Sequence, residues 1–209
     1  MNKSDVPTIK PSNKYRHFAY VTIAALFAAM ISTSSLTMAA TPSTCSSPKP
    51  NEPMFITNNC TDPHFTQPYI DIDEQRATPV PHRYIHGGFT GTDTRFAFYF
   101  PPADQYKGRF FQSTHQLITS ENDVGVFGAS PIEFAIASGG YYVQTNIGGN
   151  ETARTAEQAT SGNYDASIGG YRANAAAAKY SRVVAAQLFG AHRVYGSLFR
   201  GRGGAYQTI

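Results

Sequence analysis

Residues 171–201 read YRANAAAAKYSRVVAAQLFGAHRVYGSLFRG, and this stretch decides the fold class. Small and apolar side chains recur in its first part at a spacing of three or four residues: Ala173, Ala177, Tyr180, Val184 and Leu188. This period predicts a helix over Tyr171–Phe189 that ends at Gly190. The segment His192–Gly201 then predicts a strand. A helix that leads directly into a strand is the unit from which α/β domains are built.

The same alternation of strand and helix continues toward the N-terminus. Aromatic-rich segments bounded by Gly or Pro predict strands at Arg83–Phe89, Thr94–Phe100, Gly108–Gln112 and Tyr141–Asn146. Before the last of these strands, Pro131–Ser138 predicts a helix that Gly139 ends. We therefore expect one α/β domain over residues 82–209, with a mostly parallel sheet and flanking helices. Residues 41–81 are rich in Pro, Thr and Asn, and we expect an irregular segment there.

Ligands and chemistry in an open α/β sheet lie at the carboxyl ends of the strands. One such end reads Gly201-Arg202-Gly203-Gly204, where the predicted strand enters a glycine-rich turn and then residues of helical character. Glycines are needed in a turn this sharp because a side chain would have no room. This order of strand, glycine turn and helix is the context of a nucleophile elbow.

The stretch Tyr195–Thr208, YGSLFRGRGGAYQT, resembles the strand-and-elbow segment of secreted α/β hydrolases that carry Gly-x-Ser-Gly-Gly. The resemblance extends over most of residues 84–209 and implies the first part of that fold, truncated after the elbow strand. It also implies serine-dependent ester hydrolysis. In that reaction an elbow Ser attacks the ester, a His takes its proton, and backbone N–H groups stabilise the oxyanion.

One residue departs from the family pattern at the reacting position. Arg202 stands where the family has its Ser, and a guanidinium cannot be deprotonated to attack a carbonyl. The resemblance places the acid and the His of the triad after the nucleophile, and neither follows Arg202 in this sequence. We therefore expect no complete catalytic set, and an inactive or incomplete homologue. The alternative is an exported binding protein in which Arg202 holds an anionic ligand.

A second group of residues is expected to form an oxyanion or substrate pocket: Ser113, Thr114, His115, Gln116 and Asn146. If the sheet order is that of the hydrolases, the polar loop Ser113–Gln116 lies one strand away from the elbow. His115 is either a pocket residue or a polar loop residue. Asn146 ends the strand Tyr141–Asn146.

Several other motifs receive structural interpretations. His86-Gly87-Gly88 resembles the oxyanion motif of esterases, but it precedes the strand Thr94–Phe100, so we expect a turn between strands. Ser197 is interpreted as a sheet residue because it lies within the predicted strand. The short acidic clusters lack the spacing of a calcium loop and are interpreted as solvated surface: Asp71, Asp73 and Glu74, and Glu121 and Asp123. We expect no metal and no cofactor.

The N-terminal residues resemble an export signal. Residues 1–40 combine a basic start, an apolar run at 19–31 and small residues up to Ala40, which predicts a signal peptide and a secreted or periplasmic protein. The run is shorter than the ~20 residues that cross a bilayer, so we expect no stable membrane span after cleavage. The two cysteines, Cys45 and Cys60, are expected to form a disulfide worth about 3 kcal/mol.

The charge of the chain is concentrated in this N-terminal segment. The chain carries 17 basic and 14 acidic residues, but residues 41–209 are neutral, with 13 of each. A neutral body argues against nucleic acid as a partner and leaves a small ester-like or anionic ligand. In the printed sequence the apolar strand His192–Gly201 would form an unpaired sheet edge, which invites self-association.

Overall fold

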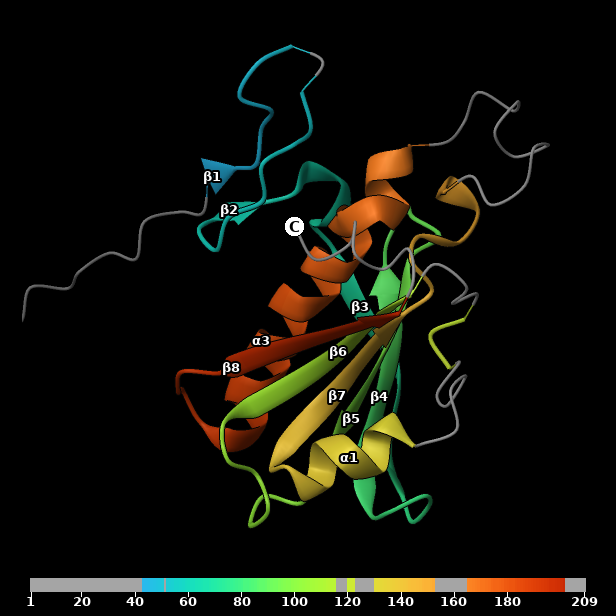
Figure 1. The fold of residues 1–209 in the computed structure, drawn as a ribbon, viewed down its shortest axis with the longest axis vertical. Coiled ribbons are helices and arrows are strands. Elements are labelled where there is room, and N and C mark those ends of the chain that lie inside the picture. The colour runs from blue at the N-terminus through green and yellow to red at the C-terminus, as the bar shows by residue number, and fades with distance from the viewer. Residues whose placement is uncertain (1–42, 51, 116–119, 123–129, 153–164, 202–209) are drawn as a thin grey trace, which may run out of the picture. The chain divides into compact units, whose positions relative to one another are not determined.

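The computed structural model describes residues 43–50, 52–115, 120–122, 130–152 and 165–201. Its centre is a six-stranded sheet in the order β3-β4-β5-β7-β6-β8 (Figure 1). The strands are β3 (Pro68–Arg76), β4 (His82–Phe89), β5 (Arg95–Phe100), β6 (Arg109–His115), β7 (Gly140–Thr145) and β8 (Tyr195–Gly201). A separate pair, β1 (Ser43–Thr44) and β2 (Cys60–Thr61), lies in the N-terminal part.

The sheet is mixed, so the expectation of a mostly parallel sheet was wrong. Strands β3, β4, β5 and β7 pair in antiparallel fashion, whereas β7, β6 and β8 are parallel. The reason is the length of the connections. Residues 77–81 and 90–94 are too short to cross over a sheet, and short connections give antiparallel neighbours. A parallel pair occurs where a helix provides the crossover, as α1 (Pro131–Ala137) does between the paired strands β6 and β7.

Strand β3 corrects a second expectation, because Pro68–Arg76 lies within the segment that was expected to be irregular. Most of its residues are exposed, and it pairs with β4 along its whole length. An exposed strand buries no alternating set of side chains, so it lacks the period that reveals strands in a sequence. The pairing slips by one residue between Ile70 and Ile72, which makes Asp71 the extra residue of a β-bulge.

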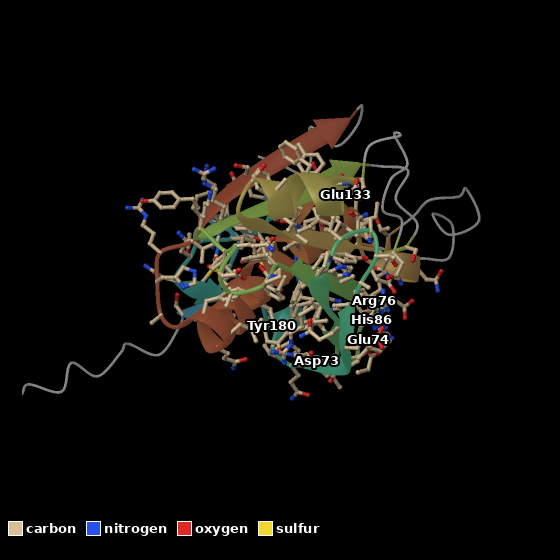
Figure 2. The ribbon with its side chains drawn as sticks, turned by 90° about the horizontal axis from the view of Figure 1, so that it is seen from below. Asp73, Glu74, Arg76, His86, Glu133 and Tyr180 are labelled. Atoms are coloured by element: carbon tan, nitrogen blue, oxygen red, sulfur yellow. A yellow bond between two sulfur atoms is a disulfide. The ribbon has the colours of Figure 1, made fainter. Side chains whose placement is uncertain are left out.

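Two helices cover the two faces of the sheet. Helix α3 (Ala173–Phe189) packs on one face and α1 (Pro131–Ala137) on the other, as Tyr180 and Glu133 show in Figure 2. Alternate side chains of β5 separate accordingly: Phe96, Phe98 and Phe100 belong to the core under α3, and Ala97 and Tyr99 to the core under α1. Because both faces are covered, β5 is buried on both sides, which explains its continuous aromatic sequence.

Both predicted helices end at the predicted glycines. Ser130 caps α1 by accepting a hydrogen bond from the Glu133 N–H, and Gly139 follows the helix with φ +74°. The predicted helix Tyr171–Phe189 is present as one π-helical turn, η3 (Ile168–Arg172), followed by α3. Gly190, with φ +83°, ends it as expected. Two short 3₁₀ segments complete the described elements: η1 (Pro63–Phe65) and η2 (Gly149–Glu151).

The disulfide between Cys45 and Cys60 is confirmed, and both cysteines are buried. The loop that it closes is fastened to the region of α3 by two contacts. The Tyr171 hydroxyl donates to the Met54 carbonyl at 2.7 Å, and the Lys179 ammonium donates to the Cys60 carbonyl. The N-terminal segment therefore packs against the domain. The predicted signal peptide lies outside the described residues.

Candidate functional site

The parallel strands β6 and β8 end side by side. Their register pairs Arg109 with Tyr195 and continues to His115 opposite Gly201, so both carboxyl ends lie at one level of the sheet. The strand that ends in Ser113–His115 is thus the direct neighbour of β8, and the roles of the two strand ends in an oxyanion pocket and an elbow stay predictions. Gln116 and the turn residues Arg202, Gly203 and Gly204 lie outside the described residues.

The segment that was expected to be a polar loop is largely strand. Ser113, Thr114 and His115 are the last three residues of β6 and pair with residues 199–201 of β8. These polar residues form a strand because β8, which lies more than eighty positions later in the sequence, pairs with their backbone. Nothing in the local sequence indicates that partner. Ser197 lies in β8, as expected.

A buried polar network joins β6, β7 and α3 at this end of the sheet. Gln112 Nε2 donates to the backbone and side-chain oxygens of Asn174 at 3.1 and 3.2 Å, and the Thr145 hydroxyl donates to Asn174 Oδ1 at 2.6 Å. All three side chains are buried. Buried amides are costly unless paired, so this network fixes the relative positions of two strand ends and one helix. The sequence analysis missed Gln112 and Asn174 because each looks like an ordinary strand or helix residue.

The chain leaves β7 through a left-handed turn. Ile147, Gly148 and Gly149 have φ values of +48°, +93° and +56°. A β-branched residue with positive φ is strained, and Ile147 is also buried. Its N–H is held by the Thr145 hydroxyl at 3.1 Å, which ties the strained residue to the polar network. Backbone strain of this kind gathers at ligand and active sites.

Asn146 fastens this turn to β5. Its Oδ1 accepts from the N–H groups of Arg95 at 3.0 Å and Gly148 at 3.2 Å, and its Nδ2 donates to the Asp93 carbonyl at 2.8 Å. The structure therefore brings Asn146 toward the start of β5, whereas Ser113 and Thr114 lie on β6. A role for these residues in an oxyanion or substrate pocket stays a prediction.

Ser113 contacts a second polar group, on the α1 face. The Tyr142 hydroxyl donates to Gln144 Oε1. Burial raises the pKa of Tyr142, and its hydrogen bond with Ser113 acts in the opposite direction. Among the described residues, Gln144 Nε2 has no hydrogen-bond partner although the residue is buried. Hydrogen-bonding groups thus occur on both faces of the sheet near the carboxyl ends of β6 and β7.

His86-Gly87-Gly88 lies in the middle and end of strand β4, so the expected turn between strands was wrong. The glycines serve close packing instead: a Cβ on Gly87 would lie 1.9 Å from the Tyr69 carbonyl oxygen of β3. The local sequence could not reveal this, because the neighbour strand β3 was itself not predicted.

His86 is clamped between two carboxylates. Its Nδ1 lies 2.5 Å from Asp71 Oδ1 at the β3 bulge, and its Nε2 lies 2.8 Å from Glu121 Oε1. Figure 2 shows His86 at the β3–β4 edge of the sheet. The sequence analysis assigned Asp71 and Glu121 to solvated surface. That was wrong for Glu121, whose side chain is only 13% exposed. The two carboxylates are 15 and 35 residues from His86, so no local motif joins them.

These clusters are not metal sites by their geometry. Within the described ranges, no group of three or more His, Cys, Asp or Glu residues is arranged to hold an ion.

Across the same ranges, no helix has the length and apolar character that a bilayer crossing requires. The described part of the site therefore offers hydrogen-bond donors, a strained turn and parallel strand ends.

Comparison with known proteins adds one weak likeness. No family model matches the chain, and no curated protein matches it. Among solved structures, a tannin acyl hydrolase from Aspergillus niger is similar over 64% of this chain and 27% of its own, with 12% identity and a TM-score of 0.37. The chain thus spans about a quarter of that protein's length. At this level the likeness supports no conclusion about activity.

Proposed function

We propose that the chain is an exported α/β-hydrolase homologue that does not hydrolyse esters, because Arg202 occupies the position of the nucleophile. The observation that supports this proposal is the register of β6 and β8. It places His115 opposite Gly201, the residue that precedes Arg202, at the carboxyl ends of two parallel strands. Because Arg202 follows Gly201 in the sequence, it would stand where this class of fold carries its chemistry.

Two observations support export. The Cys45–Cys60 disulfide needs an oxidising compartment to persist, and it is buried in the described part of the chain. The sequence of residues 1–40 has the composition of a signal peptide. The measurement that tests export is the N-terminal sequence of the chain recovered from outside the cytoplasm, which we expect to begin near position 40.

The activity is tested with chromogenic short-chain esters and a fluorophosphonate probe. We expect the pure chain to release p-nitrophenol from the acetate and butyrate esters no faster than buffer, and to remain unlabelled by the probe. A guanidinium has no electron pair to offer an acyl group at ordinary pH. Turnover that the fluorophosphonate abolishes, together with labelling of the chain, would overturn the proposal.

A second candidate is anion binding by Arg202 itself. It is favoured by the residue type, since in the predicted glycine-rich turn before a helix the Arg202 guanidinium and the backbone N–H groups would both donate to an anion. Calorimetry with acetate and phosphate tests it on the native chain and on Arg202→Ala. Heat of binding that Arg202→Ala removes supports this candidate, and equal negligible heats exclude it.

A further inference from the structure

A cavity of about 590 Å³ lies on the α3 face of the sheet. Its walls are β6 and β8, the helix α3, and the segment 53–58 of the disulfide-closed loop. Its volume falls within the range of small-molecule sites, about 300–1,000 Å³. The described residues that line it differ from those on which the proposed function rests, His115 and Gly201.

The cavity exists because small residues face it. Ala175 and Ala178 of α3 leave room beside the helix. Gly196 of β8 has no side chain, so the ring of Phe110 packs against its backbone. A Cβ on Gly196 would lie 2.2 Å from that ring, so no larger residue fits there while Phe110 keeps its place. The third wall is held in position by the contacts of Tyr171 and Lys179 with the disulfide-closed loop.

The charge of the cavity is positive. The described residues that line it include two cations, Lys179 and Arg182, and no carboxylate. Burial lowers the pKa of Lys179. Asp62 opposes this shift, and the charge of Arg182 adds to it. Two cations so close together favour an anion between them.

Arg182 lines the cavity and carries one donor that is covered by protein and lacks an acceptor within the described part of the chain, so a ligand would bind the guanidinium after it turns toward the cavity. Its Nε is buried, and among the described residues it has no hydrogen-bond acceptor. The guanidinium lies over the ring of Phe110, with Cζ 5.2 Å from the ring centre. A buried N–H of a charged group without an acceptor is costly, and the planar guanidinium matches the two oxygens of a carboxylate.

The remaining lining is largely apolar. Met54, Phe55, Ile56 and Leu198 line it together with the alanines of α3. An inorganic anion would leave this surface exposed to water, whereas a ligand with an apolar body would cover it. The cavity therefore matches a molecule with one anionic end and one apolar end.

We propose that this cavity binds a small amphipathic carboxylate, with the carboxylate on Arg182 and Lys179 and an aromatic or aliphatic body against the apolar wall. The site is independent of the proposed function. Its carboxylate contacts are Arg182 and Lys179, which have no part in that proposal, although Thr114 of the predicted substrate pocket also lines the cavity.

The test is calorimetry on the full disulfide-bonded chain with 4-phenylbutyrate, its neutral amide, and inorganic phosphate. We expect 4-phenylbutyrate to bind at least tenfold more tightly than the amide or phosphate. Arg182→Gln should weaken this binding at least tenfold, and Ala178→Leu, which fills the cavity without changing charge, should abolish it. Arg193→Gln is the matched control, because it removes an exposed cation that does not line the cavity, and it should change binding less than twofold.

Circular dichroism establishes that each variant is folded, and Lys179→Gln provides a second charge variant if Arg182→Gln is not. The proposal is overturned if 4-phenylbutyrate gives no heat, if the amide or phosphate binds equally well, or if neither charge variant weakens binding. Loss of binding in Arg202→Ala would also overturn it, because the ligand would then lie at the elbow turn. Retention of binding there supports the cavity, whatever the outcome for the proposed function.

Discussion

At the scale of single residues, two Arg–Asp pairs have the same forked geometry but differ in burial. Arg172 donates to both oxygens of Asp62 at 2.7 and 2.8 Å, and Arg83 donates to both oxygens of Asp73 at 2.7 Å. The first pair is 9% and 6% exposed, and the second 37% and 38%. The first joins the N-terminal segment to the start of α3, while the second lies along a sheet edge.

We expect Asp62→Asn to destabilise the chain by about 3 kcal/mol, because it leaves the Arg172 charge buried without its main partner. The matched substitution Asp73→Asn should cost at most about 1 kcal/mol, since water screens an exposed pair. Urea unfolding of both variants measures the difference. Equal losses would mean that burial does not set the strength of these pairs.

His82 provides a prediction on pH. Its side chain is buried, its Nδ1 donates to the Val80 carbonyl at 2.7 Å, and its Nε2 has no partner among the described residues. Burial lowers the pKa of His82 below the ordinary value of 6.5, and the charge of Arg76 lowers it further, against the bond to Val80. As pH falls through 6.5, the unfolded chain therefore binds a proton that the folded chain does not, and stability decreases.

We expect the free energy of unfolding of the native chain to exceed that of His82→Gln by more at pH 8 than at pH 5. The native chain loses stability through His82 on acidification, and the variant has no such group. Urea unfolding at several pH values between these limits measures the difference. A difference that stays constant with pH would show that His82 is protonated equally in the folded and unfolded states.

At the scale of the element, strand β3 depends on Gly87 of β4, which lets the β3 backbone approach. Gly87→Ala would place a Cβ 1.9 Å from the Tyr69 carbonyl oxygen and 2.9 Å from Phe96 Cζ. We expect it to separate β3 from β4 and to destabilise the chain by about 3 kcal/mol, the upper range for overpacking. Loss of hydrogen-exchange protection confined to residues 68–76 would identify the affected strand.

Gly170→Ala is the control for that substitution. Gly170 lies in the helical turn η3, where an added Cβ meets no atom within 4 Å. Alanine is favoured over glycine in a helix by up to about 1 kcal/mol, so this variant should be as stable as the native chain or more so. If both variants lose the same stability, the cost belongs to the loss of glycine itself and not to the contact with β3.

The elements that the sequence predicts best are those whose signal is local. The period of three and four residues from Ala173 to Leu188 predicts α3. The aromatic segments predict β4, β5 and β7, with bounds that agree with the structure within one or two residues. β3 was missed because exposed residues carry no period. The direction of the strands was misjudged because it depends on connection length. In the site, Ser113 and Thr114 were placed correctly at a strand end but taken for a loop, since their partner β8 is distant in the sequence.

At the scale of the whole molecule, β8 lies at the edge of the described sheet, where Tyr195 and Leu198 are exposed. An apolar edge strand can pair with the same strand of a second copy, so we expect the mass to rise with concentration. Ser197→Lys, on the same strand, should shift the chain toward monomer because two like charges would meet. Light scattering after size exclusion measures this. The control Gln187→Lys adds the same charge on exposed helix surface and should leave association unchanged.

The strand order also determines when each part of the sheet can form during synthesis on the ribosome. β3, β4 and β5 follow one another in the sequence and pair as neighbours, so residues 68–100 can assemble as they emerge. β6 cannot join them, because its two neighbours, β7 and β8, are both made later. Until translation passes residue 145, the nascent chain carries the aromatic segment around Phe110 and Phe111 without a partner strand. During that interval the unpaired apolar segment is exposed to aggregation with other chains.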